Sequence, residues 1–286
     1  MPRVLIAGCG YVGAASANLF ANAGWDVTGW TRSKESAEQI SAGAISATPI
    51  DINDFESVRR NRFDADVVVH CAGAAKRDDQ SYREVYGNGA ANLIASFPRA
   101  RLIFTSSTSV YAQRDGSWVS EESPAEPLTE RGKILRQAEN NVLDHGGVVL
   151  RLAGIYGPGR SFLLRSIINH APLASGSDRL VNQVHRDDVA GAIFFLAKHE
   201  VILPPRIFNV VDDLPVLRSE IMAWLSAELR IPLSSSGGIE EKRTGSNKRI
   251  SNAKLRALGW APIYPNYIDA FTRSIFRQQA GHDRVI

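Results

Sequence analysis

Short apolar runs of strand length alternate with amphipathic stretches from the N-terminus to about Gly157. The runs are rich in Val and Ile, and the stretches between them carry apolar residues at helical spacing. The apolar runs lie at residues 4–7, 26–30, 45–52, 66–70, 102–105 and 148–152, with a late one at 207–211. Strands that alternate with helices predict right-handed βαβ units, and hence an α/β fold with a doubly wound parallel sheet.

The alternation becomes less regular after Gly157. We therefore predict a first domain over residues 1–156, with a return to its sheet at about 184–211, and a smaller α/β domain made mainly of residues 157–286. Helices are expected in this later part at 161–169, 187–199, 219–230, 251–258 and 266–278. Either Asp187 or Asp188 is expected to cap its helix, and residues 281–286 are expected to form a loose tail.

Composition places the chain among ordinary globular proteins, with 44% hydrophobic and 22% charged residues in 286. A net charge of +3 suits an anionic ligand such as a nucleotide, but it does not indicate a nucleic-acid-binding protein. The most basic stretch, Lys242 to Arg256, is interrupted by polar residues and lacks interleaved aromatic residues. We interpret it as a solvated surface segment.

No apolar run reaches membrane-spanning length, and Met1-Pro-Arg leads directly into the first strand without room for a signal peptide. The expectation is a cytoplasmic protein without a membrane partner. Cys9 and Cys71 lie in apolar strand–turn contexts, so no disulfide framework is predicted. The six histidines show no metal-ligand spacing, and we expect no metal.

A glycine-rich turn follows the first apolar run. Gly8, Gly10 and Gly13 give the spacing G-x-G-x-x-G, with Tyr11 and Val12 between the last two. Gly8 permits a tight turn, Gly10 lets a pyrophosphate approach the backbone, and Gly13 lets the helix pack on the strand. The N-terminus of the helix adds free N–H groups and a positive dipole end. This context predicts a dinucleotide site; a glycine-rich turn without a ligand is the alternative.

The end of the second strand indicates which dinucleotide is bound. Sites that prefer NAD carry an acidic residue there for the ribose 2′-hydroxyl, whereas this chain has Thr31 and then Arg32. A guanidinium suits a 2′-phosphate, so NADP is favoured over NAD. The alternative is that Arg32 is a loop arginine in water.

Three later segments follow the ends of central strands. Asp51-Ile52 is a candidate contact for adenine, and the small residues Cys71-Ala72-Gly73 leave room for the nicotinamide half, or else allow tight packing under a helix. The hydroxyl-rich run Ser106 to Tyr111 comes at the carboxyl end of a central strand, where open α/β sheets bind ligands.

Together these segments resemble the extended short-chain dehydrogenase/reductase superfamily, in its NAD(P)-dependent epimerase/dehydratase branch. The matching segments occur in the family's order over nearly the whole chain. They are Gly8-Cys-Gly10-Tyr-Val-Gly13, Val68-Val-His-Cys-Ala-Gly73, Asn88, Phe104-Thr-Ser-Ser-Thr-Ser-Val-Tyr111, Arg151-Leu-Ala-Gly-Ile-Tyr-Gly-Pro-Gly159 and His185-Arg-Asp-Asp-Val-Ala190.

The resemblance implies roles for individual residues. The glycine turn, Asp51, Ile52, Cys71, Ala72, Gly73 and Asn88 match cofactor-binding positions. Ser107, with Thr108 beside it, matches the residue that holds and polarises the substrate oxygen, and Gly157 begins the loop that opens the substrate side. Lys248 and Arg249 are candidates to face a substrate phosphate. Relatives often form dimers, so a homodimer is a further expectation.

The chain departs from the family at its catalytic pair, Tyr-x-x-x-Lys. In the family the tyrosine, with its pKa lowered by the lysine, moves the proton as hydride moves. Counting back from Ala138-Glu139 places Arg131 and Leu135 at these positions, so neither role carries over. A shift of two residues gives Thr129 and Lys133 instead. Tyr111 and Tyr156 are candidates for a substitute proton donor.

Two functions remain open on this basis. One is an oxidoreductase-type enzyme that binds NADP or NAD and acts on a hydroxyl or keto carbon of a sugar-like, nucleotide-linked small molecule. The other is a non-catalytic sensor that holds NADP(H) and regulates a partner, which the missing tyrosine and lysine favour. The predicted substrate-side domain favours the enzyme.

Overall fold

The computed structural model describes residues 1–41, 45–170, 178–200, 202–233 and 246–277. The chain divides into two units, each made of separate stretches. Unit 1 comprises Met1–Ala112, Pro124–Leu152 and Arg186–Val210, and unit 2 comprises Gln113–Ser123, Ala153–His185 and Val211–Ile286. Within the described residues, no helix is long and apolar enough to cross a membrane.

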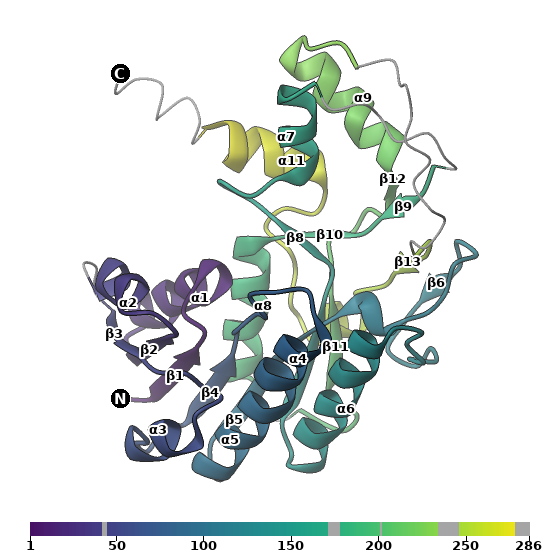
Figure 1. Ribbon diagram of the computed structural model, residues 1–286. Coiled ribbons are helices and arrows are strands. Elements are labelled where there is room, and N and C mark those ends of the chain that lie inside the picture. The colour runs from purple at the N-terminus through teal and green to yellow at the C-terminus, as the bar shows by residue number, and fades with distance from the viewer. Residues whose placement is uncertain (42–44, 171–177, 201, 234–245, 278–286) are drawn as a thin grey trace. The chain divides into compact units, whose positions relative to one another are not determined.

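Unit 1 is built on a sheet of seven strands in the order β11-β7-β5-β4-β1-β2-β3 (Figure 1). Every pairing in this sheet is parallel. The strands are β1 (Arg3–Ala7), β2 (Asp26–Thr31), β3 (Ser46–Pro49), β4 (Val67–His70), β5 (Arg101–Ser107), β7 (Val148–Leu152) and β11 (Ile207–Val210). The strand order reverses between β1 and β4, which is the switch point where doubly wound sheets bind ligands at their carboxyl edge. The predicted doubly wound parallel sheet is confirmed.

The helices of unit 1 are α1 (Tyr11–Asn22), α2 (Lys34–Ser41), α3 (Phe55–Arg60), α4 (Asp79–Tyr82), η1 (Arg83–Asn88), α5 (Gly89–Ser96), the 3₁₀ turn η2 (Thr108–Val110), α6 (Glu130–Asp144) and α8 (Arg186–Lys198). Helix α1 ends at a glycine, because Gly24 lies just beyond its C-cap with a left-handed φ of 79°. Helix α6 is capped by Thr129, whose hydroxyl accepts from the Gly132 N–H.

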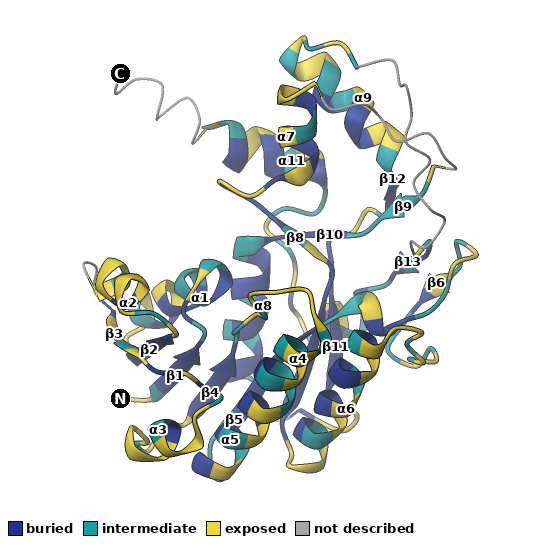
Figure 2. Ribbon diagram, in the orientation of Figure 1, coloured by how far each residue is buried: buried dark blue, intermediate teal, exposed yellow. Residues whose placement is uncertain are grey.

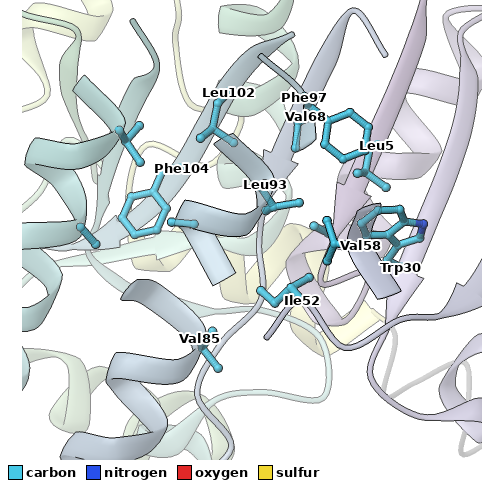
Figure 3. Close-up of a cluster of buried hydrophobic side chains, with 14 of the residues drawn as sticks. Leu5, Trp30, Ile52, Val58, Val68, Val85, Leu93, Phe97, Leu102 and Phe104 are labelled. Atoms are coloured by element: carbon cyan, nitrogen blue, oxygen red, sulfur yellow. The ribbon is translucent and has the colours of Figure 1, made fainter. Parts of the chain in front are cut away.

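One face of the sheet packs against α3, η1, α5 and α6 in a single apolar cluster (Figure 3). Alternate residues of the strands point to this face, as the two-residue period of a strand requires. The cluster includes Leu5 of β1, Val68 of β4, Phe104 of β5, Val58 of α3 and Leu93 of α5. On the opposite face α1 packs against α8, with the Phe20 and Phe194 rings edge to face at 5.0 Å. Figure 2 shows the central strands of this sheet buried and the outer faces of the helices exposed.

Unit 2 has a core of its own, centred on α7, α9 and the C-terminal helical segment. Its elements are β6 (Trp118–Val119), β8 (Gly154–Tyr156), α7 (Phe162–Ile168), β9 (Leu180–Val181), β10 (Gln183–His185), β12 (Val216–Leu217), α9 (Arg218–Leu229), β13 (Arg249–Ile250), α10 (Ala253–Ala257), α11 (Tyr267–Ala270) and η3 (Phe271–Ile275). Its strands form three two-stranded pairings, β10 with β8, β12 with β9 and β13 with β6.

One local expectation differs from the structure. Helix α8 begins at Arg186, so Asp187 and Asp188 lie in its first turn, where they favour the positive end of the helix dipole, and neither is the N-cap. The helical region between β4 and β5 begins at Asp79 and contains a π-helical stretch, η1. The short strand β6 is paired with β13. The predicted tail at 281–286 lies outside the described residues.

Candidate cofactor and active site

The glycine turn after β1 is held by contacts that only glycine allows. Gly8 has a φ of 94°, and a Cβ on it would lie 2.2 Å from the Ala72 backbone nitrogen. A Cβ on Gly13 would lie 2.3 Å from the Gly8 carbonyl oxygen. The turn is also tied to β2, because the Gly8 and Cys9 N–H groups both donate to the Trp30 carbonyl, at 3.0 and 2.8 Å. Gly8 and Gly13 therefore close the turn sterically.

Gly10 is different, and this difference tests whether a dinucleotide fits. A Cβ on Gly10 would meet no heavy atom within 4 Å, so the space beside its backbone is open. Gly10 is the N-cap residue of α1, and Tyr11 and Val12 are the first residues of that helix. The first N–H groups of a helix have no acceptor within it, and they suit an anionic group. The residues present therefore fit a pyrophosphate.

The ring of Tyr11 lies under the guanidinium of Arg186, whose Cζ is 5.1 Å from the ring centroid. Arg186 also donates from Nε to Asp187 Oδ1 at 2.8 Å. This contact joins the N-terminal turns of α1 and α8 on the same face of the sheet. It brings a cation close to the start of α1, where the sequence predicts the phosphates.

The residues predicted at the ribose end follow β2 directly. Thr31 is buried, and its hydroxyl donates to the Ser33 carbonyl at 2.9 Å. Arg32 is exposed, and within the described residues it forms no ion pair. A guanidinium without an acidic partner at this edge is available to a 2′-phosphate.

At the predicted adenine end, Asp51 is exposed and accepts from the Asn53 N–H through Oδ1 at 3.0 Å. Ile52 is buried in the core cluster of unit 1, against Gly89. Asn92 of α5 donates through Nδ2 to the carbonyls of Ile52 and Asn53, at 2.8 and 3.1 Å, and so fixes this loop. The sequence analysis did not single out Asn92; its place one helical turn beyond Asn88 was the available signal.

The loop after β4 carries Cys71, Ala72 and Gly73. Ala72 contacts Gly8, so the small residues here serve the close approach of two loops. Burial raises the pKa of the Cys9 thiol to about 11 and raises that of Cys71 as well, so both thiols stay protonated at neutral pH. The predicted contact Asn88 lies at the end of η1 and is exposed.

Ser107 ends β5 at the carboxyl edge of the sheet, on the same edge as the glycine turn. Its Oγ accepts from the Ser109 N–H at 3.1 Å, which fixes the hydroxyl and leaves its proton for another acceptor. Thr108 begins the turn η2 that follows. Ser107 is only partly buried, whereas Ser106 is buried and turns the other way. Ser107 is therefore the serine that a ligand can reach, and Ser106 belongs to the interior.

Ser106 belongs to a buried polar network beneath this edge. It donates to Glu139 Oε1 at 2.7 Å, and Glu139 forms a buried ion pair with Arg151 at 2.7 Å. The Arg151 guanidinium lies 4.7 Å from the centre of the Tyr111 ring, and the Tyr111 hydroxyl donates to Asn209 Oδ1 at 2.9 Å. The network links α6 to the strands β5, β7 and β11. The sequence analysis used Glu139 only to locate the positions of the catalytic pair. Its burial and its ion pair could not be predicted, because the sequence does not show that Arg151 lies beside it.

Tyr111 is 2% exposed, and its hydroxyl is engaged in that network. A proton donor must reach the reacting group, within hydrogen-bond distance or through one water. This geometry favours a structural role for Tyr111, and its predicted part in proton transfer stays a prediction.

The positions that the sequence analysis predicts for the family's catalytic pair are occupied by residues with other contacts. Arg131 donates from Nη1 to the Arg77 carbonyl at 2.9 Å, lies 3.9 Å from Asp79, and has its guanidinium over the Tyr82 ring. Leu135 is 3% exposed. The shifted alternative also has other roles, since Thr129 caps α6 and Lys133 is exposed near Glu130.

The remaining predicted residues lie in unit 2. The Tyr156 ring packs 5.8 Å from His185 and 5.9 Å from Phe271, in the core of that unit. His185 is fully buried as well. Gly157 has a φ of 151° and forms reciprocal backbone hydrogen bonds with Arg160.

Lys248 and Arg249 do not follow the expectation of a solvated segment. Lys248 is 2% exposed, and burial lowers its pKa from 10.5 to about 8. Arg249 is half-buried, and its guanidinium donates to the Gly116 carbonyl. Their predicted contact with a substrate phosphate stays a prediction. Among the described residues no cluster of three metal-ligating side chains occurs.

One further residue was missed. Tyr86 of η1 stacks near His70, and its hydroxyl would lie 3.9 Å from a Cβ on Gly73. Burial raises the pKa of Tyr86, which makes it a poor base at neutral pH. Because its position depends on the π-helical turn of η1, helical spacing did not indicate it.

Comparison with known proteins agrees with this geometry. The sequence profile of the NAD dependent epimerase/dehydratase family matches residues 4–210. Protein YeeZ from Escherichia coli K12 is 30% identical over 213 residues, which are 68% of this chain and 73% of that protein. A solved structure from Methylobacillus flagellatus, assigned to the NAD-dependent epimerases/dehydratases, is 27% identical with a TM-score of 0.78, covering 97% of this chain and 99% of that one.

More distant structures share the fold. The UDP-glucose 4-epimerase of Thermotoga maritima, solved with UDP-glucose, superposes with a TM-score of 0.84 at 15% identity, over 97% of this chain and 99% of that one. The UDP-glucose 4-epimerase of Thermus thermophilus, solved with NAD, gives 0.81 at 19% identity, over 94% and 96% of the two chains. The family profile covers well over half of the chain, and the glycine turn and sheet order are those described above. The chain belongs to the NAD-dependent epimerase/dehydratase family.

Proposed function

We propose that this protein is an NADP(H)-dependent enzyme that acts on a hydroxyl or keto carbon of a sugar-like, nucleotide-linked small molecule without the usual tyrosine and lysine. The observation that carries the proposal is the glycine turn, which is sterically closed at Gly8 and Gly13 and open at Gly10. The UDP-sugar complexes of structurally similar enzymes support the substrate class.

We assign binding of the substrate oxygen to Ser107. A nicotinamide cofactor, with its phosphates held at Gly10 and the start of α1, would supply hydride transfer at the reacting carbon. The Ser107 hydroxyl, held by the Ser109 N–H, donates to the substrate oxygen and polarises its bond to carbon. Arg131 and Leu135 offer no phenol or amine at the usual positions, so we assign transfer of the proton on that oxygen to water.

Cofactor preference is tested at Arg32. Calorimetric titration of the cofactor-free protein should show tighter binding of NADP than of NAD. Arg32→Ala should weaken NADP by about tenfold or more, since a charge-assisted contact is lost, and should leave NAD nearly unchanged. Arg62→Ala is the matched control, since Arg62 is also exposed and has no ion pair within the described residues. Equal loss for both cofactors would contradict the assignment of Arg32.

Catalysis is tested at Ser107 with a panel of nucleotide sugars and ketones, by following reduced cofactor. Ser107→Ala should lower turnover by about a hundredfold or more, the effect of losing one such donor. Ser109→Ala is the control, because only its backbone N–H holds Ser107. Unchanged turnover in Ser107→Ala would contradict the assignment.

The sensor remains the second candidate, and one observation favours it. Arg131 and Leu135 stand at the catalytic positions and are engaged in structural contacts on α6. A sensor would bind NADP(H) and leave it chemically unchanged with every compound of the panel. Turnover of any compound of the panel would show that the protein is an enzyme.

A further inference from the structure

A pocket of about 690 Å³ opens in unit 1 at the edge of the sheet opposite the glycine turn. It lies at the amino ends of three strands, where Val67 begins β4, Arg101 begins β5 and Val148 begins β7. The C-terminal turn of α8 and Trp25 complete its wall. The volume is in the range of small-molecule sites in proteins.

Four cationic side chains line this pocket: Arg99, Arg101, Lys198 and Arg206. Asp66 and Glu200 are the acidic residues of the lining, so positive charge is in excess there. Asp66 also accepts from the Arg3 N–H at 2.7 Å, which leaves less of its carboxylate for the pocket.

Two of the cations are held in place by backbone carbonyls. Arg101 donates from Nη1 to the carbonyls of Leu196, Ala197 and His199, at 3.0, 3.1 and 2.5 Å, and so caps the C-terminus of α8. Arg206 donates from Nε to the Ile202 carbonyl at 3.0 Å. Carbonyls fix a guanidinium without neutralising its charge. These two groups are therefore preorganised cations.

The other two cations have no acidic partner. Within the described residues, neither Arg99 nor Lys198 forms an ion pair; the Lys198 ammonium lies 5.1 Å from the centre of the Phe194 ring. His199, also in the lining, has a buried Nδ1 without a hydrogen-bond partner in the described structure. A concave surface with fixed cations, free cations and an unsatisfied ring nitrogen suits an anion with several acceptor oxygens.

The pocket is separate from the cofactor region. Arg101 and Ser107 lie at opposite ends of β5, which at 3.3 Å per residue places them about 20 Å apart. The nicotinamide, ribose and phosphate positions described above all lie at the carboxyl edge. A ligand here would be a second ligand, bound at the same time as a dinucleotide.

We propose that this pocket is a second binding site, which takes a small phosphorylated metabolite carrying two or more negative charges. The guanidinium groups of Arg101 and Arg206 supply fixed donors, and Arg99 and Lys198 close on the phosphoryl oxygens. This site is independent of the reaction assigned to Ser107.

The test is a calorimetric titration of the full chain with inorganic pyrophosphate as the probe, with and without saturating NADP. We expect one saturable site whose affinity is the same in both conditions and falls as salt is raised. The double variant Arg99→Gln/Lys198→Gln should weaken binding by about tenfold or more, and neither substitution removes a structural hydrogen bond.

The control is Arg62→Gln/Arg165→Gln, which removes the same charge from exposed positions outside the pocket. It should retain binding within about twofold. Three results would overturn the proposal: no saturable binding, equal loss in both double variants, or displacement of pyrophosphate by NADP. The last result would place the probe at the glycine turn and would leave the proposed function standing, whereas a protein that binds pyrophosphate but no dinucleotide would contradict only the proposed function.

Discussion

Leu135 lies on the buried side of α6, at the position that the resemblance predicts for a catalytic lysine. The same helix carries Glu139 one turn later, and this carboxylate is fully buried with Arg151. An ammonium at Leu135 would enter an apolar surface, next to Ile134 and Ala138, which are also buried. The burial of Leu135 is therefore consistent with the absence of the lysine, which the sequence analysis inferred by counting back from Ala138-Glu139.

Removing the charge of Glu139 should destabilise the protein strongly. Glu139→Gln leaves the buried Arg151 guanidinium without its counter-charge, and breaking one side of such a pair costs about 3–5 kcal/mol. Urea denaturation measures the free energy of unfolding. The control is Glu38→Gln, whose partner Lys34 is 3.7 Å away with both side chains well exposed, and whose loss should cost less than about 0.5 kcal/mol. Similar costs for the two variants would contradict this account of the network.

Lys248 should make stability depend on pH. Its pKa in the folded protein is about 8, below the unfolded value of 10.5, because burial disfavours the charged form. Between these values the unfolded chain binds more protons, so the contribution of Lys248 becomes more favourable as pH rises from about 8 to 10.5.

Wild-type protein should therefore gain about 3 kcal/mol relative to Lys248→Met over this window, and the variant should be the more stable of the two at pH 7. Thermal unfolding of both proteins at several pH values measures the difference. Lys133→Met, at an exposed lysine, should run parallel to wild type. A constant difference between wild type and Lys248→Met would show that Lys248 is not desolvated.

At the scale of elements, the strand–turn–helix unit from β1 to α1 requires glycine for two different reasons, which are the packing of the turn and the space for a ligand. Gly13 is required by the packing of the turn on itself, whereas Gly10 is required by nothing in the protein. The sequence motif presents both as equal members of one spacing. The structure shows that only Gly10 faces open space, which is what a ligand-binding role requires.

Substitutions in this unit should divide accordingly. Gly13→Ala should cost about 1–3 kcal/mol in urea denaturation, since its Cβ would meet the Gly8 carbonyl. Gly10→Ala should cost no more than about 1 kcal/mol but weaken NADP binding by tenfold or more. The control Gly87→Ala, in η1 with open space around it, should leave both unchanged or raise stability slightly. If Gly10→Ala binds NADP normally, the phosphates do not lie at this turn.

Most elements of unit 1 could be predicted, because strands and helices that alternate have different spacings of apolar residues in the sequence. The strands from Val4 to Leu152 appear within a few residues of their expected places. What sequence could not show was contact between distant elements: Asn92 on the loop after Ile52, or Glu139 with Arg151. The π-helical turn η1 was also missed, since an extra residue in one turn leaves no composition signal.

At the scale of the whole molecule, segments of the two units alternate along the chain. Helix α8 and strand β11 belong to unit 1, although Ala153–His185 of unit 2 precedes them. A fragment of residues 1–156 would lack both, exposing the face of the sheet that α8 covers and the edge of β7 that β11 pairs. Circular dichroism should show no cooperative thermal transition for this fragment, in contrast to the full chain. A cooperative transition with NADP binding would show that α8 and β11 are dispensable.

The late position of β11 also matters while the protein is being made. Strand β7 ends at Leu152 and its outer neighbour begins only at Ile207. At about 5–20 residues per second, a ribosome needs roughly 3–11 seconds to synthesise the chain between them. During that interval the growing polypeptide carries an unpaired, apolar strand edge, which is the kind of surface that chaperones cover and that neighbouring nascent chains join. The edge of β7 is therefore the part of the sheet of unit 1 that stays open longest, until β11 has been synthesised.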